Sequence, residues 1–312
     1  MRPRIIWVPY RAETTKSSQT TSHCTRTMNL APLKYGKILM KDGGPLERIQ
    51  VSSITLDGQK YYQANSFLSP YLHLQQDSLF VFGQSSGTGT HTSRMVATHI
   101  AISESLERWA YYFLNQIGHR RAYGFDRESS TIGMAAYPGL FPAQARKRAR
   151  REAIEHYCLS NTYRGRLKCT HLYTDKNTGT VACLENPISD DIVILAWRTS
   201  EDGLTAHGSA CSSKASEAIE KAQIEMERSM FAIDLFFKRN RHNEPRNLSK
   251  IKDKQERRII KLALQGEQHT FRKLLKNDPP ARRHLSPSKV VDRSIPGPWQ
   301  KYATVWRVLY SD

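Results

Sequence analysis

Apolar and polar residues alternate through residues 46–64, on both sides of the dipeptide Asp57-Gly58. A period of two is typical of strands with one buried face, and Asp-Gly is a favoured hairpin turn. We therefore expect a β-hairpin here. The pattern also predicts a strand within 78–90 that ends in a small-residue turn. Further strands are predicted within 169–184, 191–210 and 303–310, with turns at 177–179 and 202–203.

Three longer segments have the spacing of amphipathic helices. They cover residues 92–115, 142–162 and about 214–238. In the first helix one apolar stripe is expected to face the core. Its members are Met95, Ile102, Leu106, Trp109 and Phe113.

The three predicted helices repeat one pattern, in which two alanines four residues apart precede a glutamate by three residues. The copies read Ala97, Ala101, Glu104, Glu107, Arg108; then Ala145, Ala149, Glu152, Glu155, His156; then Ala218, Ala222, Glu225, Arg228. Each copy follows a strand and a turn rich in glycine or serine, at 87–89, 133–139 and 208–210. We expect three strand–turn–helix units inside one α+β domain.

The repeated pattern has a chemical implication. Small alanines beside the acidic residues let a backbone or a ligand come close. A lone ExxER is usually a solvated salt-bridge pattern. Carboxylates from several helices that face one point repel one another unless a cation neutralises them, and oxygen ligands in that number favour Mg²⁺ over zinc.

The chain is strongly basic, and its charge is uneven. Its 312 residues carry a formal net charge of +18, with a mean hydropathy of −0.58. Residues 238–293 contain 17 Lys and Arg against six Asp and Glu, and their apolar spacing suggests two short basic helices. This segment is a solvated insertion, a site for an acidic leader peptide, or an RNA contact. Phe271 is its one aromatic residue apart from histidines, which argues against base stacking.

The five cysteines form no CxxC pair, which argues against a disulfide framework or a zinc site and favours a reducing cytoplasm. The longest apolar runs are far too short to cross a membrane, so no membrane association is expected.

The order of these motifs resembles that of the YcaO family. The corresponding stretches are "SSITLDGQKYYQA", "SSGTG", "IAISESLERW", "STIGMAAYPG" with "ARREAIEH", and "AHGSACSSKASEAIEKAQIEMER". Together they cover roughly residues 46–238.

The resemblance implies an α+β YcaO-like domain that binds ATP through Mg²⁺ ions. It implies that the metal ligands or their supporting residues are Glu104, Glu107, Glu152, Glu155 and Glu225. The residues expected near the phosphates are Ser86, Gly87, Gly89, Arg108 and Lys221. No catalytic residue is assigned.

Several positions depart from the family pattern. Thr88 replaces a lysine, Ile100 a serine, Ile132 an asparagine, Gln144 an acid, His156 an arginine and Lys221 an arginine. Loss of a phosphate-binding lysine and a carboxylate weakens nucleotide binding. The chain is therefore a divergent enzyme or a family fold without its chemistry.

The leading functional prediction is ATP/Mg²⁺-dependent activation of a peptide backbone amide, of the cyclodehydratase or thioamidation type, in the biosynthesis of modified peptides. The expected partners are a precursor peptide and a leader-binding or second YcaO subunit, or a second copy of the chain. One alternative is a non-catalytic YcaO-like partner that binds such a peptide or subunit. Another is a basic RNA- or ribosome-associated protein; a nucleic-acid partner is less favoured.

The predicted organisation has four parts. Residues 1–45 form an arm that is disordered in part, 46–238 the nucleotide-binding core, 239–293 a basic helical segment, and 294–312 a final strand that completes the core.

Overall fold

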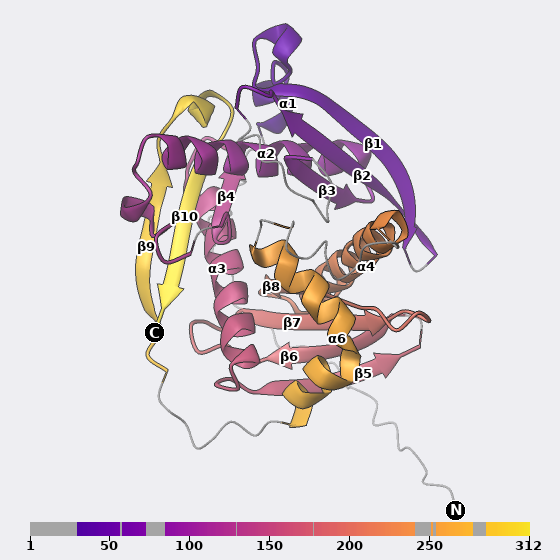
Figure 1. Ribbon diagram of the computed structural model, residues 1–312. Helices are drawn as coiled ribbons and strands as arrows, with labels where there is room; N and C mark the ends of the chain where they lie inside the picture. Colours follow the sequence, from indigo (N-terminus) through magenta and orange to yellow (C-terminus); the bar gives the residue numbers. More distant parts are fainter. Residues whose placement is uncertain are drawn as a thin grey trace, which may run out of the picture.

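The computed structural model describes residues 30–56, 58–72, 85–128, 130–176, 178–240, 251, 254–276 and 285–312. Within these residues the strands form three antiparallel sheets, ordered β1-β2-β3, β4-β10-β9 and β5-β6-β7-β8 (Figure 1). The α+β class is therefore confirmed. The described residues contain no helix that is both long and apolar enough to span a bilayer.

Most strands lie close to their predicted positions, but β4 lies inside the turn predicted at 133–139 and β9 begins in the predicted basic helical segment, so neither was predicted as a strand. Their bounds are β1 Leu46–Leu56, β2 Gln59–Leu68, β3 Gly87–His91, β4 Met134–Tyr137, β5 Cys169–Asp175, β6 Gly179–Leu184, β7 Ile192–Thr199, β8 Thr205–Ser212, β9 Ser288–Ile295 and β10 Thr304–Ser311. The predicted hairpin is confirmed by the β1–β2 pairing, in which Leu56 lies opposite Gln59. Most of the strand expected at 78–90 falls outside the described residues, and β3 occupies its end.

The helices follow the strands in the predicted order. The long ones are α2 (Arg94–Gln116), α3 (Ala143–Tyr163), α4 (Ala215–Asn240) and α6 (Lys254–Lys276). The short ones are α1 (Ala31–Lys34) and the 3₁₀ turns Met40–Asp42, Arg121–Tyr123 and Pro298–Lys301. Helices α2, α3 and α4 come directly after β3, β4 and β8, so the predicted strand–helix unit occurs three times.

The strand of each unit lies at the edge of its sheet. Within the described residues β3 pairs with β2 alone, β4 with β10 alone, and β8 with β7 alone. An edge strand has one row of backbone amides without strand partners. Each unit therefore presents free N–H groups, and these become important at the candidate site.

The glycines of the first and third units lie in strands, so the predicted turns at 87–89 and 208–210 are wrong. Gly87 is in β3 and Gly208 in β8. A Cβ on Gly87 would lie 2.1 Å from the Ala101 carbonyl oxygen, and one on Gly208 would lie 2.3 Å from that of Ala222. The glycines and alanines of the repeat thus let strand and helix backbones touch.

This close packing gives a stability prediction. The variants Gly87→Ala and Gly208→Ala should each lose about 1–3 kcal/mol of unfolding free energy or more, because backbone must move to admit the methyl group. Gly36→Ala is the control, since its Cβ would meet nothing nearer than 3.4 Å. Urea unfolding of the three variants tests this, and equal losses at all three sites would contradict the packing argument.

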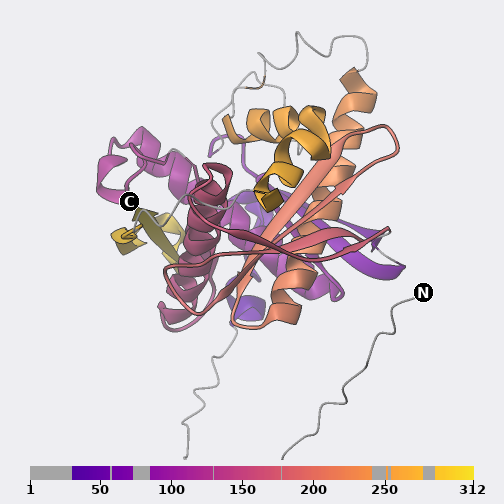
Figure 2. The same ribbon diagram turned by 90° about the horizontal axis from the view of Figure 1, so that it is seen from below.

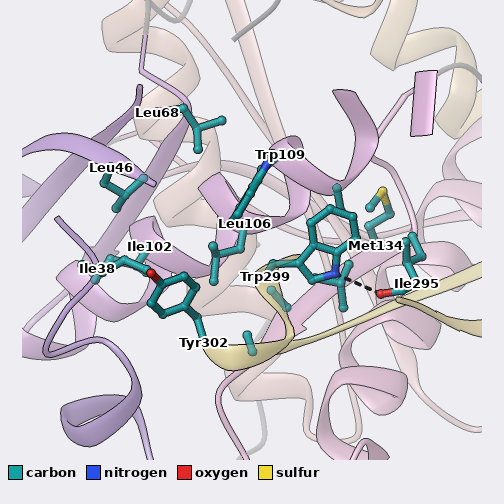
Figure 3. Packing of buried hydrophobic residues seen from close by; sticks show 14 of the residues in the cluster. Ile38, Leu46, Leu68, Ile102, Leu106, Trp109, Met134, Ile295, Trp299 and Tyr302 are labelled. Atoms are coloured by element: carbon teal, nitrogen blue, oxygen red, sulfur yellow. Dashed lines mark hydrogen bonds between the residues drawn. The ribbon is translucent and has the colours of Figure 1, made fainter. Parts of the chain in front are cut away.

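The main core lies between α2, the first sheet and the C-terminal strands (Figure 3). Leu106, Trp109 and Ile102 of α2 are buried there, as the helical pattern predicts. The Trp109 and Trp299 rings meet edge to face with centroids 5.6 Å apart, and Trp299 Nε1 donates to the Ile295 carbonyl oxygen at 2.9 Å. Met95 was also expected in this stripe, but 59% of its surface is exposed because it lies in the first turn of α2, away from these contacts.

The four-stranded sheet is covered on both faces (Figure 2). Its alternating residues Val193, Leu195 and Trp197 pack with residues of α3 and α6, whereas Ile194 and Ala196 pack with α4. The Trp197 ring stacks on Phe271 of α6, with centroids 5.1 Å apart. Helix α6 is one continuous helix of 23 residues, where two short helices had been expected. The helix runs through Gly266, because its apolar stripe is held on the sheet.

Two predicted boundaries need correction. The boundary at 293/294 cuts β9, which pairs with β10 from residue 288 onward. At the other end Ala31, Tyr35 and Ile38 are buried in the main core, so the folded domain starts before residue 46. Both errors arise because these segments gain their structure from partners that are distant in the sequence.

Candidate functional site

Five glutamates from three helices form the candidate site, and backbone amides in or next to edge strands bind four of them. On α2, Glu104 Oε2 accepts a hydrogen bond of 2.7 Å from the amide of Thr88 in β3. Three residues later, Glu107 Oε1 accepts one of 2.7 Å from the amide of Ala136 in β4. The first glutamate is thus held by the strand of its own unit and the second by the strand of the next unit.

Helix α3 repeats this arrangement. Glu152 accepts a hydrogen bond from the amide of Gly133, next to β4, and Glu155 accepts one from the amide of Cys211 in β8. Glu155 Oε1 also accepts a bond of 2.7 Å from Ser209 Oγ. The carboxylates therefore lie at the free edges of the sheets, where hydrogen bonds from backbone amides fix their positions.

The carboxylates repel one another in a closed ring. The charge of Glu104 raises the pKa values of Glu107 and Glu225. The charges of Glu107 and Glu155 raise the pKa of Glu152, and the charge of Glu225 raises the pKa of Glu155. We call these five residues the glutamate ring.

Burial, followed by this repulsion, raises the pKa values of four ring glutamates. The pKa of Glu107 and that of Glu155 rise to about 8, and those of Glu152 and Glu225 also rise. The Glu225 side chain reaches solvent, yet the protein around it is dense enough to disfavour its charge. Such repulsion is relieved by a bound cation.

Basic residues lie around the ring. Arg108 Nη2 is 3.3 Å from Glu104 Oε1, and Arg228 opposes the rise of the Glu225 pKa. Lys221 likewise opposes the rise of the Glu155 pKa, and its Nζ lies 2.7 Å from Glu217 Oε1. Of the residues expected near phosphate, Arg108 and Lys221 therefore lie near the ring.

The other three expected phosphate contacts have structural roles. Ser86 is buried and its Oγ accepts a bond of 3.0 Å from the Leu68 amide, while Gly87 and Gly89 pack on α2. The Thr88 hydroxyl donates to Asn65 Oδ1 at 3.2 Å. A phosphate role for Ser86, Gly87 and Gly89 remains a prediction that these contacts do not support.

Sequence reasoning missed one residue beside the ring. Arg307 of β10 is completely buried, and its charge opposes the rise of the Glu152 pKa. The signal in the sequence is a charged residue inside the apolar stretch "ATVWRVLY", which a solvated position would not explain.

The ring fits Mg²⁺ better than it fits a metal with only protein ligands. Within the residues that the structure describes, no three His, Cys, Asp or Glu side chains are grouped to hold one ion. Mg²⁺ typically takes one or two carboxylates and completes its shell with water and phosphate oxygens. Oxygen donors with raised pKa values and nearby basic residues suit that combination. A mostly apolar pocket beside α1, lined by Tyr35, His99 and Ile102 among others, includes none of the five glutamates.

Comparisons with known proteins support the fold. No protein-family model and no curated protein matches the sequence. Among solved structures, YcaO from Methanopyrus kandleri bound with AMPPCP and Mg²⁺ aligns with a TM-score of 0.51 and 14% identity, over 88% of this chain and 87% of that one. The chain therefore has a YcaO-like fold.

Proposed function

We propose that this chain binds ATP with Mg²⁺ at the glutamate ring and uses it to activate a backbone amide of a peptide. The observation that carries the proposal is the ring itself, in which five carboxylates from three helices repel their neighbours and four of them accept a hydrogen bond from an amide in or next to an edge strand. The similar YcaO structure was solved with an ATP analogue and Mg²⁺, which supports the same ligands here.

The chain's own residues have separate tasks in this proposal. Glu104, Glu107, Glu152, Glu155 and Glu225 supply oxygen ligands for the cations. Arg108 and Lys221 lie close enough to the ring to face phosphate oxygens. The amides of Thr88, Ala136, Gly133 and Cys211 orient the carboxylates before any ligand arrives, so that little reorganisation is needed.

The reaction class follows from the chemistry of an amide. An amide oxygen is a poor leaving group. A neighbouring Cys, Ser or Thr side chain, or sulfide, would add to the amide carbon. The amide oxygen would then take the γ-phosphoryl group of ATP, with release of ADP, and leave as inorganic phosphate, so that an azoline or a thioamide remains. The precursor peptide is thus the proposed partner, and catalysis would rest on positioning and charge stabilisation.

Calorimetric titration tests nucleotide binding directly. ATP should bind the purified chain with a micromolar dissociation constant in the presence of Mg²⁺ and at least tenfold more weakly with EDTA. AMP, which lacks the β- and γ-phosphates, is the matched ligand control. Equal affinity for ATP and AMP, or no binding of ATP with Mg²⁺, would contradict the proposal.

A non-catalytic YcaO-like partner is the second candidate, favoured by specific observations. Ser86 Oγ accepts a hydrogen bond from the Leu68 amide of the first sheet. His156 lies 3.3 Å from Glu128 and does not pair with a ring carboxylate. This candidate predicts binding of a precursor peptide or a second subunit in the absence of ATP. A peptide affinity that does not change when ATP and Mg²⁺ are added would favour it.

A further inference from the structure

The basic residue of the helical repeat has a different partner in α3. In α2, Arg108 reaches Glu104 of its own helix at 3.3 Å. At the corresponding position of α3, His156 Nε2 lies 3.3 Å from Glu128 Oε2, in the segment before β4. Arg108 is thus a basic partner of Glu104, whereas His156, at the same position of the repeat, pairs with Glu128 and not with Glu152.

Arg307 supplies a cation on this side of the ring from another part of the chain. It lies in β10, fully buried, with its guanidinium 4.5 Å from the centre of the Phe125 ring. Its Nη1 donates to the carbonyl oxygens of Ser130, at 3.1 Å, and of Ile132, and its Nη2 donates to that of Glu128 at 3.3 Å. Among the described residues no carboxylate forms an ion pair with it.

One of these bonds connects Arg307 to the ring through a single peptide group. The Ile132 carbonyl that Arg307 binds and the Gly133 amide that binds Glu152 belong to the same peptide unit. The neighbouring backbone is fixed as well, because the Val308 amide donates to the Gly133 carbonyl oxygen at 2.8 Å. A guanidinium on the carbonyl strengthens the amide as a donor, since hydrogen bonds in a chain polarise one another.

We propose that Arg307 is a positioning residue that orients and polarises the Ile132–Gly133 peptide, so that its N–H holds Glu152 ready for the cation. The inference rests on the proposed function of the glutamate ring. The charges of the two residues are consistent with this role. Burial lowers the pKa of Arg307 to about 10, and the charge of Glu152 opposes that decrease. The charge of Arg307 in turn opposes the rise of the Glu152 pKa.

The binding experiment compares Arg307→Met and Arg307→Lys with wild type and with Arg293→Met. Arg293 lies opposite Arg307 on β9 and also donates to a backbone carbonyl, that of Ala122 at 3.2 Å. Arg307→Met should weaken Mg²⁺-dependent ATP binding about 10- to 100-fold, the range typical of residues that support metal ligands. Arg307→Lys keeps the charge and should lose less, whereas Arg293→Met should bind like wild type.

A spectroscopic readout follows the peptide group itself. Carbonyl-¹³C isoleucine with ¹⁵N glycine selects the amides of Gly118 and Gly133, because the chain has two Ile-Gly dipeptides. In the ligand-free protein, Arg307→Met should move the Gly133 amide proton upfield, because its bond to Glu152 weakens. The Gly118 signal should stay in place.

The outcomes separate the two proposals. No ATP binding by wild type would reject the proposed function, while the Gly133 signal would still test the link to Arg307. Wild-type binding together with an unchanged affinity and an unchanged Gly133 signal in Arg307→Met would overturn the positioning role. An equal loss in Arg293→Met would overturn it too, because the effect would then be a general one on the sheet. If Arg307→Met does not fold, Arg307→Lys decides by the same readouts.

Discussion

The double variant Glu104→Gln/Glu152→Gln should lose Mg²⁺-dependent ATP binding almost completely, with an affinity at least 100-fold below that of wild type. Each substitution removes one proposed charged oxygen ligand from the glutamate ring. A hydrogen bond or ligand contact of a charged group contributes about 1.5–3 kcal/mol, so two such losses amount to roughly 3–6 kcal/mol. Calorimetric titration with ATP and Mg²⁺ measures the change.

The fold should survive these substitutions, because the glutamine oxygen can still accept the amides of Thr88 and Gly133. Circular dichroism and the melting temperature check this. Glu47→Gln is the matched control, since Glu47 lies in β1 and pairs with Arg48. A double variant that keeps wild-type affinity would show that ATP, if bound, does not depend on the ring.

The ligand-free protein should lose stability as the pH rises from about 4.5 to about 8. The pKa values of Glu107 and Glu155 are raised to about 8 by burial and by neighbouring carboxylates, so over this range the folded state binds more protons than the unfolded state. The free energy of unfolding then decreases with pH, and the decrease ends above the folded-state pKa. Each unit of upward shift corresponds to about 1.4 kcal/mol, so a total loss of at least about 1 kcal/mol is expected.

Urea unfolding at several pH values tests this dependence. Glu107→Gln and Glu155→Gln should each flatten the curve and be more stable than wild type at pH 8.5, since a neutral side chain has no proton to lose. The lowered pKa values of Glu128 and Asp292 act in the opposite direction below about pH 4.5, and the lowered pKa of His99 does so below about pH 6.5. A wild-type stability that is constant or rises between about pH 6.5 and 8 would contradict the electrostatic description of the ring.

The helices of the ring could be predicted from the sequence because their signal is local. A spacing of alanine and glutamate repeated three times placed α2, α3 and α4 within one or two residues of their observed ends. The same spacing indicated correctly that small residues allow close approach. The segment that approaches Ala101 is the strand backbone at Gly87. The glycines were wrongly assigned to turns because they serve this close contact between strand and helix.

The assembly of the ring could not be predicted in the same way. It depends on which strands lie at sheet edges and on which amides remain free there, and both are set by pairings between distant segments. The contact between Arg307 and the Ser130 carbonyl spans 177 residues of sequence. One sequence taken alone carries no record of such a contact, although a buried charge in an apolar strand gives a hint of it.

The pairing of β4 with β10 has a consequence for the order of folding. Strand β4 has four residues and, within the described residues, β10 is its one strand partner. So short a strand has little stability alone, and a contact of such large sequence separation forms slowly. Ala136, whose amide binds Glu107, lies within this pairing, and Gly133, whose amide binds Glu152, comes directly before it. We therefore expect α2 and the β1–β2 hairpin to form early during refolding, while competence to bind ATP appears with the slowest phase, when β10 docks.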